Sequence, residues 1–427
     1  MYHSSAITST GELYTGGAND EGQVLPSEAA SNHGHNKQGG FLLSLTCVEP
    51  IFDLLQLLWV LLTDNQPTFA GDIRPRVVEE LGTHRISMVS CGLHHTVCLT
   101  ASGLALSFGG NESGQCGHSG QKHSRVFPKV VDFANRERGS ALIKQVAAGD
   151  LFTVFLTTSG EVYTCGAGSY MGCEKYRNKS VPQAERIDSL LGSNAILIAV
   201  GDRHAFAVTS TGEIYGWGNG KNGQLGLGED VFDFEGCHVQ IPLRLSTGDL
   251  LNDGNVVGLA AGQSHSLFWT SQGRLLGCGS NKHGQLSSLS PRITTLSAIT
   301  FHEELKYCVM AACGQNHSLV LCSEFTDDLN LSTRSANTHT KGMRILAFGS
   351  NNFGQVDGSS STSLFRSPVD ITSNIADSRF LYIAAGGDQS FALGVPSDSS
   401  VPSSPGVTGP GLGSGLSDSF TTNWMKR

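Results

Sequence analysis

The sequence predicts an all-β fold made of one small unit repeated along most of the chain. Two motifs support this prediction. One is a glycine-rich stretch, such as GWGNGKNGQLGLGED at 216–230, and the other is a small residue, Gly, two variable residues and His, followed by alternating apolar residues, as in AVGDRHAFAV at 199–208. Copies of both recur in order, and their apolar alternation is typical of short strands. Short antiparallel strands repeated in units of this size form a β-propeller.

The glycine-rich stretch also admits a different interpretation. Glycines 218, 220 and 223 match the spacing of a dinucleotide-binding loop, which would indicate an oxidoreductase. That loop requires a helix directly after it, whereas further glycines follow here and disfavour one. The recurrence of the stretch also argues against a single cofactor site, so no cofactor is expected. We expect Gly223 to allow a tight turn and Gln224 to bind backbone groups that the turn leaves unpaired.

The His position occurs seven times, with 52 to 92 residues between neighbouring copies: His3, His95, Phe152, His204, His265, His317 and Gln389. Five histidines at one structural position are too many for a single active site. We therefore expect the repeated His to hold its own blade together by a hydrogen bond, with no catalytic or metal-binding role.

The two linked motifs, A-G-x-x-H-[ST] and G-x-[IVL]-Y-x-[WF]-G-x-x-x-x-G-Q-L-G, resemble the regulator of chromosome condensation repeat family. The resemblance covers residues 1–24 and about 79–395. It implies a β-propeller of four-stranded antiparallel blades, seven in number with an incomplete first or last blade. A literal count of complete units gives six as the alternative. The first unit lacks its small-Gly half and the last lacks its G-x-[IV]-Y half, so we expect these halves to complement each other.

Three segments depart from the repeat. Residues 25–78 form an insertion whose apolar part, 41–66, is interrupted by charged residues and Pro, so no transmembrane span is expected. It is interpreted as a partner-binding or membrane-touching helix, a helix packed on the ring, or translated non-coding sequence. A polar loop at 323–342 interrupts the later blades, and the Ser/Pro/Gly-rich tail at 396–427 is predicted to be disordered.

Composition narrows the class of protein. The net charge of −9 argues against direct nucleic-acid binding, which favours basic surfaces. The 11 cysteines include no C-x-x-C pair, so they indicate buried apolar positions in a reducing compartment and give no support for zinc. No signal peptide is recognisable, which favours the cytoplasm or nucleus. Phosphate-loop, nucleophile-turn and H-E-x-x-H motifs are absent, so we expect that the protein is not an enzyme. We also expect it to be a monomer.

Two functions compete. The favoured one is a protein-interaction scaffold that docks a partner on one face of the ring. The alternative, implied by the resemblance, is a guanine-nucleotide exchange factor for a Ran-like small GTPase, although the tight turn at 157–161 departs from the wedge hairpin of the family's Ran exchanger. In that family the GTPase-facing surface includes side chains between the repeated Gly and His, which here are His94, Asp150, Asp202, Arg203, Gln263, Asn316 and Asp388. For Asp150 and Asp202 the alternative role is simple turn stabilisation.

Overall fold

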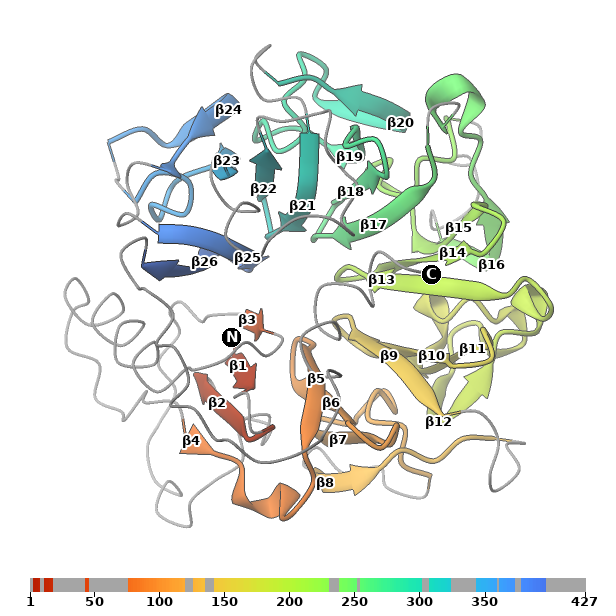
Figure 1. Cartoon of the computed structure of the whole chain (residues 1–427). Helices are drawn as coiled ribbons and strands as arrows, with labels where there is room; N and C mark the ends of the chain where they lie inside the picture. The colour runs from red at the N-terminus through yellow and green to blue at the C-terminus, as the bar shows by residue number, and fades with distance from the viewer. Residues whose placement is uncertain are drawn as a thin grey trace, which may run out of the picture.

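The structure is a computed structural model that describes residues 3–7, 11–17, 43–45, 76–119, 126–134, 142–229, 238–251, 254–301, 307–323, 343–358, 361–372 and 378–396. These residues form seven β-sheets arranged around a common axis (Figure 1). Six sheets have four strands and the last has two. The predicted seven-bladed propeller with an incomplete end blade is therefore confirmed.

The sheets follow one another along the chain. The strands of the first four are β1 (His3–Ile7), β2 (Leu13–Gly17), β3 (Leu43–Leu45) and β4 (Arg76–Val77); β5 (Ile86–Cys91), β6 (His95–Thr100), β7 (Ala105–Gly109) and β8 (Val126–Val130); β9 (Ile143–Ala148), β10 (Phe152–Thr157), β11 (Val162–Ala167) and β12 (Ser180–Arg186); β13 (Ala195–Val200), β14 (His204–Thr209), β15 (Ile214–Asn219) and β16 (His238–Arg244).

The last three sheets complete the ring. Their strands are β17 (Val256–Ala261), β18 (His265–Thr270), β19 (Leu275–Ser280) and β20 (Arg292–Ile299); β21 (Tyr307–Cys313), β22 (His317–Ser323), β23 (Met343–Ser350) and β24 (Leu364–Asp370); β25 (Ser378–Gly386) and β26 (Gln389–Pro396). The described helices are short 3-10 turns, none long and apolar enough to cross a bilayer: η1 (Glu79–Leu81), η2 (Gly168–Tyr170), η3 (Glu174–Tyr176), η4 (Asp188–Leu190) and η6 (Gly248–Leu251).

Each complete blade is built by the two sequence motifs. In the blade β13–β16, the small-Gly motif joins β13 to β14, and a tight turn, with Gly212 N–H bonded to the Thr209 carbonyl at 3.0 Å, joins β14 to β15. Every residue of β14 is buried because neighbouring blades cover both of its faces. At the end of β15, Gly218 has φ of +91°, and a Cβ there would lie 2.5 Å from the Arg203 carbonyl oxygen. Only glycine fits that position.

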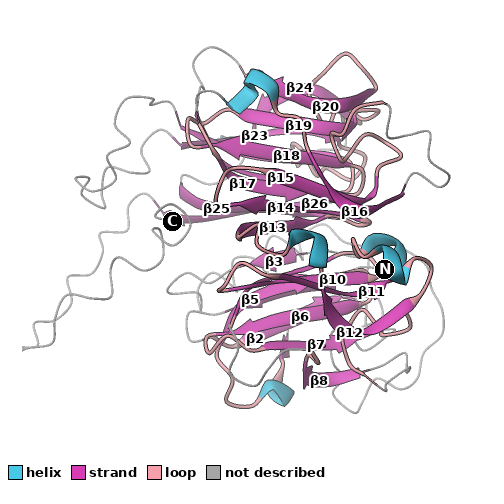
Figure 2. Cartoon of the chain, turned by 90° about the vertical axis from the view of Figure 1, so that its right-hand side faces the viewer, coloured by secondary structure: helices cyan, strands magenta, loops and turns pink. Residues whose placement is uncertain are grey.

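The strands run between two faces of the ring, as the side view shows (Figure 2). We call one the glycine face; it carries the loops between the first two strands of each blade, such as 201–203, and the glycine-rich connections, such as 219–228. The opposite hairpin face carries the tight turns between the second and third strands, such as 157–161 and 209–213. The hydrophobic core lies between successive sheets, where for example the Phe206 and Phe268 rings meet edge-on at 5.0 Å.

The ring closes differently from the sequence prediction. The inner strands contact one another in a complete circuit: β5, β9, β13, β17, β21, β25, β3 and again β5. The two partial units do not combine into one blade, because β25 and β26 form a sheet of their own. In the first sheet the inner place is taken by β3, from the predicted insertion 25–78, which pairs in parallel with β1. An exposed edge favours such a substitute strand, which explains why the prediction of complementary halves was wrong.

The departures from the repeat are only partly described. Within the apolar part 41–66, residues 43–45 are a strand and not a helix. The remainder of that part, the loop residues 324–342 and the tail 397–427 lie outside the described residues.

Candidate protein-interaction face

The repeated histidines connect neighbouring blades. Each imidazole is fully buried, and its Nε2 lies 2.7 to 3.0 Å from a Ser or Thr hydroxyl in the next blade: His3 to Thr96, His95 to Thr153, His204 to Ser266, His265 to Ser318 and His317 to Ser390. These contacts cross the blade boundary, so the prediction that each His holds its own blade was wrong. The imidazole is long enough to cross the blade boundary, where a Ser or Thr directly follows the His position of the next copy of the motif.

The same hydroxyl also binds the glycine-rich connection of the preceding blade. Ser266 donates to the Gln224 carbonyl oxygen at 2.8 Å, so its oxygen accepts a hydrogen bond from His204 Nε2–H. The Gln224 side chain accepts the Asn222 N–H at 2.8 Å, as expected for the turn. Gly223, with φ of +82°, lies against the next blade, where a Cβ would sit 2.7 Å from the Ile293 carbonyl oxygen. We call this arrangement of His, hydroxyl and Gln carbonyl the interblade lock.

Burial keeps the locking histidines neutral. It lowers the pKa of His3, His95, His204 and His265 to about 3 and that of His317 to about 4. A neutral imidazole donating through Nε2 is a structural group, because its acid–base chemistry lies far from neutral pH. Among the described residues, no group of three or more His, Cys, Asp or Glu could hold a metal ion.

One blade boundary replaces the lock with apolar contacts. Phe152 stands in the His position, and the next blade carries Ala205 where the others carry a hydroxyl. The connection that should supply a Gln carbonyl has Gly172 in its place, and a Cβ there would lie 2.9 Å from the Trp217 ring. Both Phe152 and Trp217 are fully buried. The imidazole and the hydroxyl of the lock are therefore lost together, and large rings fill the space.

Five of the predicted partner-binding residues form one polar arc on the glycine face. Arg203 Nε lies 3.1 Å from Asp150 Oδ2, and the Asp150 N–H donates to the Asp202 carbonyl at 2.7 Å. The Gln263 side chain hydrogen-bonds the Asp202 carboxyl, and His94 is close enough to Asp150 to influence its ionisation. The arc spans four successive blades, although its members are far apart in the sequence.

Burial and like charge make the arc electrostatically unusual. Burial, reinforced by the neighbouring Asp150, raises the pKa of Asp202 to about 7, although its bond to Gln263 and the nearby Arg203 oppose this shift. Burial also raises the pKa of Asp150, against the opposing effects of Arg203 and His94. Arg203 is about half exposed, at 52%, while Asp150 is 14% exposed. Perturbed carboxyls beside an exposed cation are typical of binding surfaces.

The other two predicted residues lie outside the arc. The backbone carbonyl of Asn316 accepts the Ser350 N–H at 2.9 Å, the same bond that Arg203 makes with the Asn219 N–H. Asp388 accepts a hydrogen bond from Gln355 Nε2 at 3.4 Å. Sequence reasoning missed Tyr170, whose hydroxyl helps to raise the pKa of the Arg203 guanidinium. The Tyr170 ring packs on His238, with 5.3 Å between ring centroids. Its only signal was its place in the one glycine-rich copy that departs from the repeat.

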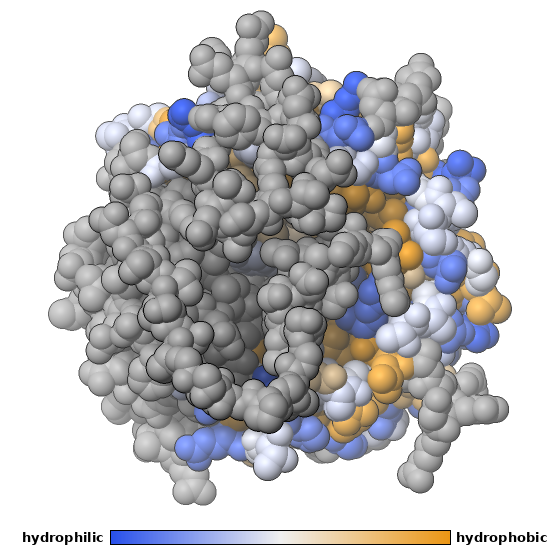
Figure 3. Space-filling view, in the orientation of Figure 1, coloured by the Kyte–Doolittle hydropathy of each residue, from blue (hydrophilic) through white to orange (hydrophobic). Residues whose placement is uncertain are grey.

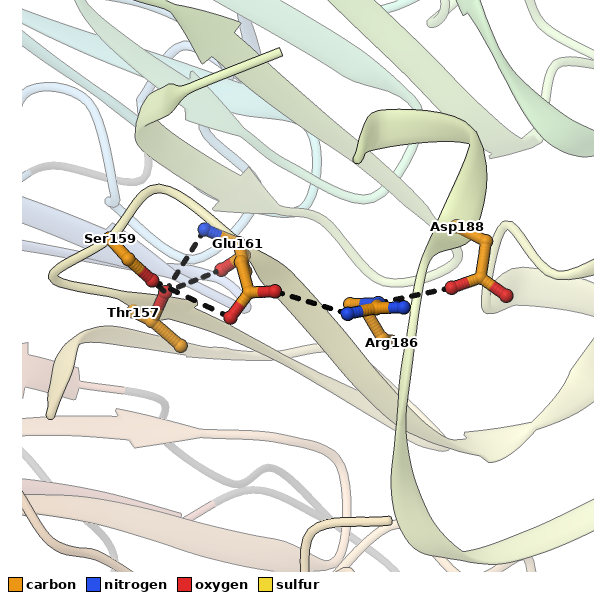
Figure 4. A network of polar contacts seen from close by, with 5 residues as sticks. All are labelled: Thr157, Ser159, Glu161, Arg186 and Asp188. Carbon is orange, nitrogen blue, oxygen red and sulfur yellow. Dashed lines mark hydrogen bonds and ion pairs between the residues drawn. The ribbon is translucent and has the colours of Figure 1, made fainter. Parts of the chain in front are cut away.

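The hairpin face carries a second repeated polar contact, within blades rather than between them. Glu161 Oε1 lies 3.2 Å from Arg186 Nη1, Arg186 Nε lies 3.1 Å from Asp188 Oδ1, and Thr157 Oγ1 accepts the Glu161 N–H at 3.0 Å (Figure 4). The following blade repeats the ion pair as Glu213 with Arg244, at 3.1 Å, and a later blade reverses it as Arg344 with Asp370, at 2.9 Å. These pairs tie third strands to fourth strands, so we assign them a structural role.

A closed ring of blades with polar loops on a rigid frame defines the class of the protein, a β-propeller with a loop-bearing face. The described surface is mixed, with hydrophilic residues around the rim and hydrophobic residues nearer the centre of one face (Figure 3). A family model described as "RCC1-like domain" matches residues 56–401, and the chain belongs to that family.

Relatives and solved structures agree with this assignment. The chain is 28% identical over 271 residues to E3 ubiquitin-protein ligase HERC2 of Homo sapiens, covering 63% of this chain and 4% of HERC2. It is 32% identical over 255 residues to the ultraviolet-B receptor UVR8 of Arabidopsis thaliana, covering 58% of this chain and 53% of UVR8. The chain thus spans at most about half of these relatives.

Among solved structures, Prp20p of Saccharomyces cerevisiae matches with a TM-score of 0.66 at 19% identity, covering 93% of this chain and 81% of that chain. Human WBSCR16 matches with a TM-score of 0.53 at 20% identity, covering 77% of this chain and 94% of that chain. At this level of identity the structural matches show the fold alone.

Proposed function

We propose that this protein is a non-catalytic scaffold that docks a protein partner on the glycine face of its ring. The observation that carries the proposal is the polar arc of His94, Asp150, Asp202, Arg203 and Gln263, which crosses the apolar Phe152 boundary and is flanked by an interblade lock on each side. A preorganised surface loses little conformational entropy on binding, so a rigid ring suits this task. Nine buried, free cysteines among the described residues support a reducing compartment, the cytoplasm or nucleus.

The electrostatics of the arc favour a basic partner group. Asp150 already has a cation beside it, in Arg203, whereas the Asp202 carboxyl has a pKa raised to about 7 by burial and by Asp150. A Lys or Arg from a partner would stabilise the charged form of Asp202 and recover the cost of its desolvation. We therefore expect the partner to present a positively charged side chain to Asp202.

The second candidate is nucleotide exchange on a Ran-like small GTPase. Its support is the likeness to Prp20p, whose structure is described together with its binding to Gsp1p and histones, and the acidic residues at the matching loop positions. An exchange factor acts by binding the nucleotide-free GTPase more tightly than the loaded one. The turn at 157–161 is tight, with Gly160 N–H bonded to the Thr157 carbonyl at 3.1 Å, so the described part of that blade supplies no wedge.

Capture of partners with and without a nucleotide chelator separates the two functions. Immobilised full-length chain would be mixed with cell extract and, separately, with a purified Ran-like GTPase in loaded and chelator-stripped forms. A scaffold captures its partner whatever the nucleotide state, whereas an exchange factor selects the empty GTPase and accelerates release of a fluorescent nucleotide. Asp202→Ala should lose the partner and Asp188→Asn, on the hairpin face, should keep it. Equal capture by both variants would contradict docking on the glycine face.

A further inference from the structure

Two carboxyl side chains of the polar arc are brought together by the backbone. Asp150 and Asp202 occupy equivalent positions in the small-Gly loops of neighbouring blades, and the Asp150 N–H donates to the Asp202 carbonyl at 2.7 Å. The loops stack closely because a glycine precedes each Asp: a Cβ on Gly149 would lie 2.7 Å from the Gly201 carbonyl oxygen. The charge of Asp150 therefore opposes ionisation of Asp202.

The two carboxyls share a single positive partner. In the part of the chain that the structure describes, the one ion pair of either acid joins Arg203 Nε to Asp150 Oδ2 at 3.1 Å. The side-chain hydrogen bond of Asp202 is made with Gln263, a neutral amide. Asp202 is thus the carboxyl that has no ion pair of its own.

The other titratable groups nearby do not supply a second fixed charge. His94 lies beside Asp150, the acid that Arg203 already balances, and Tyr170 and His238 lie beside Arg203. Burial and the nearby Arg203 lower the pKa of His238, so its imidazole is neutral at neutral pH. Ionised Asp202 therefore needs a cation from outside the cluster.

The surroundings of Asp202 suit both of its charge states. Burial, reinforced by Asp150, raises its pKa to about 7, so the protonated and charged forms are similarly populated near neutral pH. The Gln263 amide fits either form, because its NH₂ donates to a carboxylate and its carbonyl accepts from a carboxylic acid. Asp202 is also partly exposed, unlike the fully enclosed locking histidines, so a partner's side chain has access to it.

We propose that Asp202, together with Asp150, forms a proton-gated cation site: the empty site holds a proton, and a guanidinium or ammonium group of the docked partner replaces it. This inference rests on the proposed docking function and adds its regulation. The partner's group is already charged, so the carboxyl O–H bond breaks, the proton passes to the solvent and the net charge of the site is unchanged. By linkage, docking tightens as the pH rises through neutrality and weakens as it falls.

The first test follows the carboxyl itself, by NMR titration of the full chain with ¹³C-labelled Asp carboxyl carbons. We expect a signal that titrates with a midpoint near 7 and is absent from Asp202→Asn. Gln263→Lys places a tethered cation beside Asp202 and should lower this midpoint by about one pH unit or more. Gln263→Met, of similar length and without charge, should not lower it. Titration of Asp202 in the ordinary carboxyl range, or equal midpoints in the Lys and Met variants, would overturn the proposal.

The second test uses N-acetylarginine amide as the cation and its neutral counterpart, N-acetylcitrulline amide, as the control. The affinity for the arginine compound, followed by the same NMR signals, should fall about tenfold from pH 8 to pH 6, with thermal unfolding showing a folded ring at both values. Asp202→Asn should bind it weakly at both. Equal binding of the two compounds, or affinity that does not change with pH, would overturn the proposal.

A third variant and the docking experiment keep the alternatives apart. His94→Gln removes the imidazole beside Asp150 and should leave the pH dependence in place. Its disappearance in that variant would assign the proton to His94 and overturn the proposal. The two claims about the glycine face also fail separately: docking fails if Asp202→Ala keeps its captured partner, whereas proton gating fails on the titrations above.

Discussion

At the scale of the residue, the interblade lock explains why His and a hydroxyl recur together, whereas Gln recurs because its side chain accepts an N–H of its own turn. His204 donates to Ser266, and Ser266 donates to the Gln224 carbonyl, so removal of one member leaves buried polar atoms without partners. We expect His204→Ala to lower the free energy of unfolding by about 2–4 kcal/mol, because it also opens a cavity. His204→Phe with Ser266→Ala, which copies the Phe152–Ala205 boundary, should cost less than the two single changes added together, with a coupling of about 1 kcal/mol. Urea unfolding of the four variants measures this, and additive costs would contradict the lock.

The same histidines predict acid sensitivity. Their pKa falls from 6.5 to about 3 or 4 on folding, so the unfolded chain binds more protons below pH 6.5 and stability is lost as pH falls towards the folded values. At pH 5.5 each costs about 1.4 kcal/mol relative to neutral pH. Asp202, Asp150 and Asp388, whose pKa values are raised, act in the opposite direction, but they are fewer than the five histidines.

Unfolding measured at pH 7.5 and 5.5 checks this dependence. The double variant His204→Phe with Ser266→Ala should lose about 1.4 kcal/mol less than the wild type between these values, since one titrating group is gone. Equal losses would show that His204 does not stay neutral in the folded ring.

At the scale of the element, the third strand ends at a glycine that the neighbouring strand requires. Gly218 has φ of +91° and no room for a Cβ, whereas Gly192 has φ of +79° and a Cβ added there would meet no atom within 4 Å. Gly192→Ala should therefore cost about 1 kcal/mol, for the backbone conformation alone. Gly218→Ala should cost about 3 kcal/mol or more, since the steric clash adds to it. Similar costs in thermal unfolding would contradict the close approach.

The ion pairs between third and fourth strands predict a smaller effect on stability, which depends on which strand carries which charge. Arg344 with Asp370 reverses the order of Glu213 with Arg244. Arg344→Glu should lower stability by about 0.5–1 kcal/mol, because it places like charges together on a partly exposed surface. Adding Asp370→Arg should restore most of that loss, and failure of the second change to rescue the first would contradict pairwise contact.

At the scale of the whole molecule, the sequence predicted the ring but not how its parts join. The apolar alternation and the glycine spacing were sufficient for strands and turns, because they are local, whereas the number of seven blades came from the family resemblance. The direction of the His contact was not predictable, since a hydrogen bond within a blade and one across the boundary give the same sequence period. Nor was β3, because a substitute strand in an insertion carries no motif. Asp150 and Asp202 were identified separately, but only the closed ring brings them together with Gln263.

The polar arc is the central claim about function, and reversal of its charge tests it most directly. Partner recovered from extract would be quantified for the wild type, for Asp202→Lys and for Asp188→Lys on the hairpin face, each with its thermal unfolding measured alongside. We predict that Asp202→Lys reduces recovery about tenfold or more with the ring still folded, because it repels the partner's basic group, and that Asp188→Lys leaves recovery unchanged. Unchanged recovery with Asp202→Lys, or an equal loss with Asp188→Lys, would contradict docking on the glycine face.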